Sequence, residues 1–90
     1  MAMPIYESAE DYLEAILVIQ QRKGIVHSID VAEETGFSKA SVSVAMKKLR
    51  ENGYISMDKD GSLKLLAPGK KIAERIWERN RVLTHFFISI

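Results

Sequence analysis

Residues 28–53 read SIDVAEETGFSKASVSVAMKKLRENG, and their pattern is the strongest indication of the fold. Residues 28–35 predict a short helix that buries Ile29 and Ala32. A four-residue connection that contains Gly36 follows, and a second helical pattern begins directly after it. Two short helices joined by a glycine-containing turn are typical of a helix-turn-helix.

The second helix of this motif is expected to begin after Ser38, because a serine hydroxyl is a good N-cap. Asn52-Gly53 provides the stop signal at its other end. Its apolar residues recur at i, i+3, i+4 and i+7, which is the spacing of one buried helix face. These inward positions are Val42, Ala45, Met46 and Leu49.

On the carboxyl side the period changes from helical to extended. Residues 54–57 and 63–66 predict two strands around Asp60-Gly61, a two-residue hairpin signal. Pro68 suits the first turn of a further helix. The apolar face of that helix comprises Ile72, Ala73, Ile76, Leu83 and Phe87.

On the amino side another helix is expected before Lys23-Gly24. Its apolar stripe comprises Ala9, Tyr12, Leu13, Ile16, Leu17 and Gln20. The predicted fold is therefore mainly α with a small β-hairpin wing: a winged helix-turn-helix of three helices, a hairpin and a long fourth helix. Residues 1–67 would form the DNA-binding domain, and residues 68–90 the start of a linking or dimerisation helix that the chain end truncates.

The composition of the chain argues against several classes of protein. The chain has 90 residues and no cysteine, which excludes disulfides and thiol chemistry and suits a cytoplasmic location. Its longest apolar run, residues 15–19, is far shorter than the ~20 residues of a membrane span, so no membrane partner is expected. No phosphate-cradling glycine pattern and no recognisable Ser–His–Asp arrangement occurs, so we expect no enzyme.

The charge is divided unevenly along the chain. Residues 1–37 carry seven acidic and two basic side chains, a net charge of −5, whereas residues 38–90 carry eleven basic and five acidic ones, a net charge of +6. Such asymmetry favours a polyanion as partner of the second segment and a cation or basic partner for the first.

The exposed side of the predicted second helix of the motif carries the expected DNA contacts. In a helix-turn-helix this helix enters the major groove with its amino-terminal residues towards the base edges. Small and hydroxylated side chains allow close approach and can contact thymine methyls, phosphates or bases, and lysines contact phosphates. The predicted contacts are Ser38, Lys39, Ala40, Ser41, Ser43, Val44, Lys47 and Lys48, with Lys59 at the wing tip. Because no Arg, Asn or Gln lies among them, an A·T-rich site is expected.

Glu7, Glu10, Asp11 and Glu14 share one face of the first predicted helix. Carboxylates three residues apart on a helix can reach one hard cation such as Mn²⁺, Fe²⁺ or Mg²⁺. The alternative interpretation is a solvated face whose negative charges favour the helix dipole. In the fourth predicted helix, Asn80 interrupts the apolar line and is either hydrogen-bonded internally or directed at a site.

Four segments carry a family resemblance: Glu10–Ile16, Asp30–Glu33, Ser41–Ser43 and Ala67–Lys71. Their order and spacing are similar to the amino-terminal half of the DtxR/MntR metalloregulators, the diphtheria-toxin-repressor-like repressors that depend on iron or manganese. The resemblance covers nearly the whole chain. It implies a homodimeric winged-helix repressor that binds double-stranded DNA at a palindromic operator and is controlled by Mn²⁺ or Fe²⁺.

The resemblance also implies a ligand set. The family's first-helix ligands fall on Asp11 and, in manganese-type members, on Glu14, while the family's fourth-helix histidine falls on Asn80. An amide oxygen is a poorer ligand than imidazole for these metals. The family's other ligands come from a later dimerisation helix that this chain lacks, so the site is expected to be incomplete here and complete only in the full-length protein.

Two other functions fit the residues. One is a winged-helix transcriptional regulator without metal control, which Asn80 favours. The other is a winged helix that binds proteins through the apolar residues 86–87 and the acidic first helix.

Overall fold

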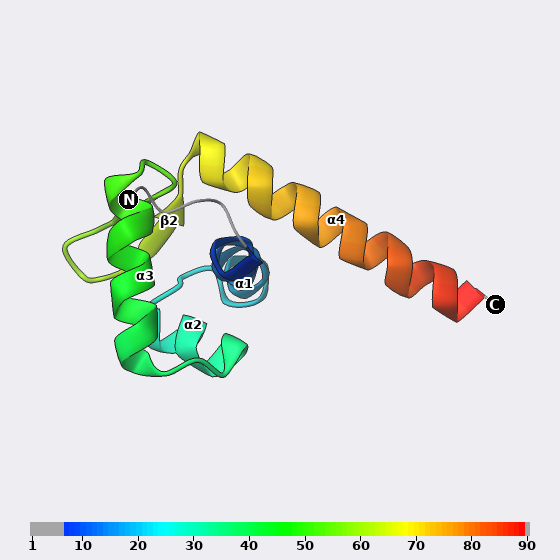
Figure 1. Ribbon diagram of the computed structural model, residues 1–90, viewed down its shortest axis with the longest axis horizontal. Coiled ribbons are helices and arrows are strands. Elements are labelled where there is room, and N and C mark those ends of the chain that lie inside the picture. Colours follow the sequence, from blue (N-terminus) through cyan, green and yellow to red (C-terminus); the bar gives the residue numbers. More distant parts are fainter. Residues whose placement is uncertain (1–6, 90) are drawn as a thin grey trace.

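The computed structural model describes the backbone of residues 7–89 and the side chains of residues 9–79. Its elements, in order, are α1 (Glu7–Lys23), α2 (Ser28–Thr35), α3 (Lys39–Glu51), β1 (Ile55–Met57), β2 (Leu63–Leu65) and α4 (Ala67–Ser89). The predicted fold is confirmed: three helices, an antiparallel hairpin and a long fourth helix form a winged helix-turn-helix (Figure 1).

Helix α1 is the centre of the molecule. It packs against α2, α3, α4 and β2, and in Figure 1 it is seen nearly end-on, with α3 on one side and α4 on the other. Its predicted stripe is buried except for Gln20, which is half-buried, and Leu13, Ile16 and Ile19 have no exposed surface at all. Burial of three such side chains contributes roughly 1.5–3 kcal/mol each, so α1 organises the core.

Helix α2 buries a different face from the predicted one. Val31 and Ala32 are buried, but Ile29 is 43% exposed. The prediction that Ile29 belongs to the core is therefore wrong. Successive helical residues are about 100° apart, so Ile29, two residues before Val31, lies on nearly the opposite side of the helix from it. Contacts with α1 and α3 cover the Val31 side of α2 and leave the Ile29 side open to solvent.

The turn between α2 and α3 has the predicted chemistry. Gly36 has φ +79° and its N–H donates to the carbonyl of Ala32 at 2.9 Å, which closes α2 in a left-handed conformation that favours glycine. Ser38 then caps α3, because its Oγ accepts from the backbone N–H of Ser41 at 3.1 Å. The predicted inward residues of α3 are all buried: Val42, Ala45, Met46 and Leu49.

The hairpin has the predicted strands and a different turn. Ile55 pairs with Leu65 and Met57 with Leu63. The N–H of Gly61 donates to the carbonyl of Asp58, so the turn is centred on residues 59–60 with Gly61 (φ +85°) after it. The prediction of a two-residue turn at Asp60-Gly61 is therefore wrong. Such a turn needs a positive φ at Asp60, and among the described residues only glycines have a positive φ.

An isolated bridge links the two-stranded sheet to the connection between α1 and α2. The N–H of Leu63 donates to the carbonyl of Val26 at 2.7 Å, and the two residues form an antiparallel bridge. Val26 lies in the connection between α1 and α2 and is 1% exposed. This bridge joins the wing directly to the start of the helix-turn-helix.

Helix α4 is attached to the wing through a close backbone approach. The N–H of Leu66 donates to the carbonyl of Tyr54 at 2.9 Å, and a Cβ added at Gly69 would overlap that same carbonyl oxygen. Ala73 and Ile76 are buried and Ile72 is half-buried, as predicted, whereas Leu83 and Phe87 lie outside the described side chains. No helix in the described part of the chain is long and apolar enough to cross a membrane.

Candidate nucleic-acid interface and the neighbouring carboxylate face

The side of α3 away from the core is open to solvent. Val44 is 57% exposed although it is apolar, and it lies between the buried Val42 and Ala45 in sequence. The helical period of about 3.6 residues places one side of α3 in the core and leaves the side that carries Val44 exposed. The predicted contacts on this helix are all exposed: Lys39, Ala40, Ser41, Ser43, Val44, Lys47 and Lys48.

Two of the predicted serine contacts already bond one another. The Oγ of Ser38 accepts the N–H of Ser41 and donates to the Oγ of Ser41 at 3.0 Å. The two hydroxyls therefore stabilise the first turn of α3, and a contact to DNA would have to share them. Both residues are exposed, so the cap and a phosphate oxygen could be bonded together.

The wing carries little net positive charge. Lys59 is exposed at its tip between Asp58 and Asp60, and the Nζ of Lys64 lies 3.3 Å from the Oδ2 of Asp58. Asp60 accepts the backbone N–H of Ser62 at 3.0 Å, and this hydrogen bond lowers the pKa of its carboxyl, so the charge persists at neutral pH. The wing thus adds at most one unpaired cation to a nucleic-acid surface.

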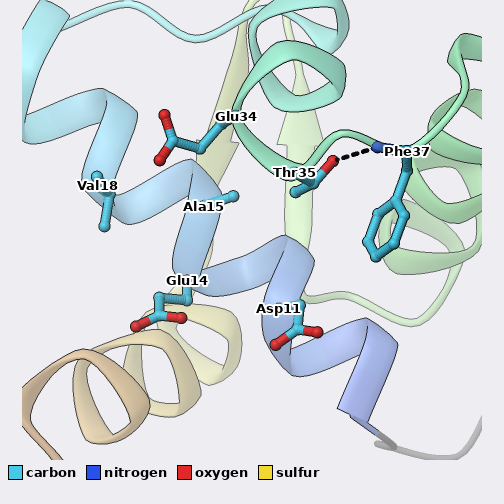
Figure 2. A pocket seen from close by; sticks show the side chains of 7 residues that line it. All are labelled: Asp11, Glu14, Ala15, Val18, Glu34, Thr35 and Phe37. Atoms are coloured by element: carbon cyan, nitrogen blue, oxygen red, sulfur yellow. Dashed lines mark hydrogen bonds between the residues drawn. The ribbon is translucent and has the colours of Figure 1, made fainter. Parts of the chain in front are cut away.

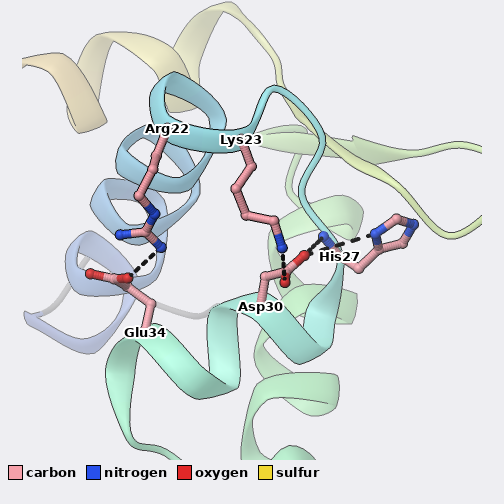
Figure 3. Close-up of polar contacts among 5 residues, drawn as sticks. All are labelled: Arg22, Lys23, His27, Asp30 and Glu34. Atoms are coloured by element: carbon pink, nitrogen blue, oxygen red, sulfur yellow. Dashed lines mark hydrogen bonds and ion pairs between the residues drawn. The ribbon is translucent and has the colours of Figure 1, made fainter.

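Ion pairs connect the end of α1 to α2 (Figure 3). The Nη2 of Arg22 lies 3.0 Å from the Oε1 of Glu34, and the Nζ of Lys23 lies 2.7 Å from the Oδ1 of Asp30. The other oxygen of Asp30 accepts the backbone N–H of His27 at 2.9 Å and so caps α2. The hydrogen bond from Lys23, and then that from His27, hold the pKa of the Asp30 carboxyl below its ordinary value.

Replacing Asp30 by alanine is expected to lower the free energy of unfolding by about 1–2 kcal/mol, because α2 loses its cap and an ion pair whose carboxylate is largely covered. Urea unfolding followed by circular dichroism measures this change. Glu34→Ala is the matched control, since the Arg22–Glu34 pair is exposed and such pairs contribute roughly 0–1 kcal/mol. An equal or larger loss for Glu34→Ala would contradict the assignment.

The contribution of Asp30 to the free energy of unfolding is expected to depend on pH. A carboxyl whose pKa is lower in the folded state stabilises that state above its unfolded pKa, here the ordinary 3.8, and loses this contribution as pH falls through the folded pKa. The stability difference between the wild type and Asp30→Ala should therefore be full at pH 7 and shrink below about pH 4. Thermal unfolding at pH 7 and pH 3 tests this, and a constant difference would exclude the linkage.

The predicted carboxylate pair lines a hollow of about 330 Å³ between α1 and the turn that leads to α3 (Figure 2). Asp11 is exposed and Glu14 half-buried. The hollow is lined by Asp11, Glu14, Ala15, Val18, Glu34, Thr35 and Phe37. Within the described side chains, no three metal-ligating residues are arranged to hold a metal ion.

Oxygen donors at Asp11 and Glu14 match the preference of hard divalent cations in kind but do not complete a coordination shell. The position of Asn80 lies in α4, and its side chain is outside the described residues. The donor set in this part of the chain therefore fits a divalent metal in part, and further ligands are required.

Phe37 was not singled out from the sequence. Its ring centroid lies 5.3 Å from that of Tyr12, so the turn before α3 packs on α1 beside Asp11. Val26 was missed as well, although the β-branched pair Ile25-Val26 after Gly24 is a signal for an extended segment.

Comparison with known proteins identifies a matching family and relatives of similar sequence. The model of a family described as the iron dependent repressor, N-terminal DNA binding domain, matches residues 5–63. Two proteins named HTH-type transcriptional regulator MntR, from Geobacillus thermodenitrificans and Bacillus velezensis, are each 34% identical over 79 residues. These alignments cover 88% of this chain and 56% of each relative, so the chain spans little more than half their length.

Solved structures share the fold at lower identity. A MarR family protein from Bacillus stearothermophilus superposes with a TM-score of 0.69 at 19% identity, covering 93% of this chain and 60% of that one. MepR, a transcription regulator of a Staphylococcus aureus multidrug efflux pump, superposes with a TM-score of 0.61 at 16% identity, covering 90% and 62%. These likenesses establish the architecture.

Proposed function

We propose, from the fact that this chain belongs to the iron-dependent repressor family, that it is the DNA-binding part of a dimeric, metal-responsive transcriptional repressor. The family consists of DNA-binding transcriptional regulators and not of enzymes. A role at chromosomal DNA would place the protein in the cytoplasm.

The observation that carries DNA binding is the open side of α3. It combines small side chains with the lysines Lys39, Lys47 and Lys48, while the opposite side is wholly in the core. Ala40, Ser43 and Val44 present only small groups, so the helix backbone can approach the floor of the major groove. The lysines would neutralise phosphates and position the helix without reading sequence.

We propose a palindromic, A·T-rich operator and a homodimer. Two copies would place their α3 helices one DNA turn apart, ~34 Å, in successive major grooves. Helix α4 starts beside the wing and runs past α1 on the side away from α3, so it would lead from the DNA-binding domain to a dimerisation region (Figure 1). Residues 1–67 and 68–90 would thus divide between these two roles.

We propose that Asp11 and Glu14 supply oxygen ligands to Mn²⁺ or Fe²⁺ and that groups outside this chain complete the site. A divalent cation, when bound, would supply the positive charge that holds these carboxylates against a dimerisation region. A metal that binds the DNA-competent arrangement more tightly would raise operator affinity by the same factor. Two carboxylates alone bind such metals weakly, so this chain by itself is expected to respond little.

Titration of a fluorescent A·T-rich palindromic duplex tests the DNA-binding function. Log affinity should fall linearly with log salt, with a slope of about −0.9 for each phosphate contact. A G·C-rich duplex of the same length is the control for sequence preference. Binding with neither salt dependence nor sequence preference would refute the proposal.

Calorimetry of the full-length gene product with Mn²⁺ tests the metal function. Binding in the micromolar range or tighter is expected, and Asp11→Ala should weaken it by at least about 10-fold, because even the loss of a group that only orients a ligand costs roughly 10–100-fold. Glu10→Ala, a neighbouring carboxylate that does not line the hollow, is the control. Absence of metal binding, with operator binding intact, would instead favour a regulator without metal control.

A further inference from the structure

A second hollow lies beside the candidate DNA-reading helix. It has a volume of about 150 Å³ and is lined by Ser28 and Ile29 from the first turn of α2 and by Lys39 and Ser43 from α3. Lys39 and Ser43 belong to the predicted DNA surface, whereas Ile29 was expected in the core and is instead 43% exposed. The structure thus extends the side of α3 proposed to contact DNA onto α2.

The lining of this hollow is mainly apolar. Ile29 contributes a branched aliphatic side chain, and a lysine such as Lys39 can offer its methylene stem while its ammonium group stays in water. The hydroxyls of Ser28 and Ser43 and the ammonium group of Lys39 can bind phosphate oxygens at the edge of the hollow, whereas its apolar surface offers nothing to an anion and stabilises a small apolar group that leaves water. The chemistry of the hollow therefore selects an apolar part of the DNA.

The major groove presents one apolar group, the 5-methyl of thymine. The positive net charge of residues 38–90 and the rim lysine Lys39 are complementary to DNA, and they would bring the groove edge to this hollow. A methyl group is far smaller than 150 Å³, so it can enter without movement of the helices.

We infer that the Ile29 hollow between α2 and α3 receives a thymine 5-methyl group at the edge of each half-site. Ile29 is then a specificity-determining residue that reads thymine against cytosine and against uracil. The inference rests on the proposed DNA-binding function and deepens it, because it adds a reading position on α2 to those on α3.

The test uses duplexes selected from a random pool by the full-length gene product in the presence of Mn²⁺. Each thymine of the selected site is replaced in turn by deoxyuridine, which removes only the methyl, and affinity is measured by fluorescence anisotropy. At one thymine of each half-site the wild type should lose about 4-fold in affinity, as expected for one buried methyl. With Ile29→Ala the parent duplex should bind about 4-fold more weakly, and the same uracil replacement should then have little further effect.

Ile25→Ala is the matched control, because Ile25 is also an exposed isoleucine and does not line the hollow. It should retain the full uracil effect of the wild type. The inference is overturned if Ile29→Ala keeps the wild-type uracil profile, since α3 alone would then read thymine. It is also overturned if Ile29→Ala weakens thymine and uracil duplexes equally at every position, which would indicate contact with deoxyribose. If the selection itself yields no preferred sequence, the proposed DNA-binding function is refuted before Ile29 is tested.

Discussion

Replacing Lys47 and Lys48 together by glutamate is expected to weaken binding to duplex DNA by roughly 100-fold at moderate salt. Both lysines are exposed on α3, and the change lowers the net charge of the chain by four units, from +1 to −3. Two attractions to phosphate become two repulsions. The slope of log affinity against log salt should become shallower by about 1.8, since each lost phosphate contact removes about 0.9.

The control for this prediction is the pair Lys70→Glu and Lys71→Glu. These two lysines are also exposed and adjacent, and their replacement changes net charge equally, but they lie in the first turns of α4. A purely long-range effect of net charge would make the two double variants equally weak. The α3 variant should instead lose far more affinity, while its urea unfolding stays within about 1 kcal/mol of the wild type. Full DNA binding by the α3 variant would favour a protein-binding role.

Replacing Gly69 by alanine is expected to destabilise the fold by about 2–3 kcal/mol, which corresponds to a fall of roughly 10 °C in Tm. In an unobstructed helix this substitution stabilises by up to about 1 kcal/mol, so the predicted effect has the opposite sign. The reason is the close approach of Gly69 to the carbonyl of Tyr54, which is backbone and therefore cannot swing aside. That carbonyl also accepts the N–H of Leu66, so a shift there disturbs the junction between wing and α4.

Lys70→Ala is the control for this substitution. It changes an exposed neighbour in the same turn of α4 and should stay within about 0.5 kcal/mol of the wild type. Urea unfolding of both variants, followed by the helical circular-dichroism signal, makes the comparison. A Gly69→Ala protein as stable as the wild type would mean that α4 does not lie against Tyr54 as described.

Much of the candidate site was predictable from local sequence. The exposed contacts on α3 follow from one regular period, because Val42, Ala45, Met46 and Leu49 define a buried face and leave the rest to solvent. The Ser38 cap and the Gly36 turn follow from the chemistry of single residues. Each of these features needs only neighbours within one or two helical turns.

The remaining features depend on contacts between distant segments. Ile29 and Val31 are equally apolar, and only the positions of α1 and α3 decide that Val31 is buried. The bridge from Val26 to Leu63 joins residues far apart in the chain, so no local pattern contains it. Lys23 and Asp30 are only seven residues apart, but their ion pair forms because of how α1 and α2 pack across the connection between them.

The order of the elements, the buried face of α3 and the division of charge could be predicted before the structure, because periodicity, capping and composition are local properties. Helix packing, in contrast, is what leaves one side of α2 open to solvent, and it therefore brings Ile29 together with Lys39 and Ser43 in one hollow beside the proposed DNA surface. It also places Asp11 in one hollow with Phe37 from the turn before α3. Both depend on the packing of helices across the core, where the shape of the partner surface, and not the residue's own preference, decides burial.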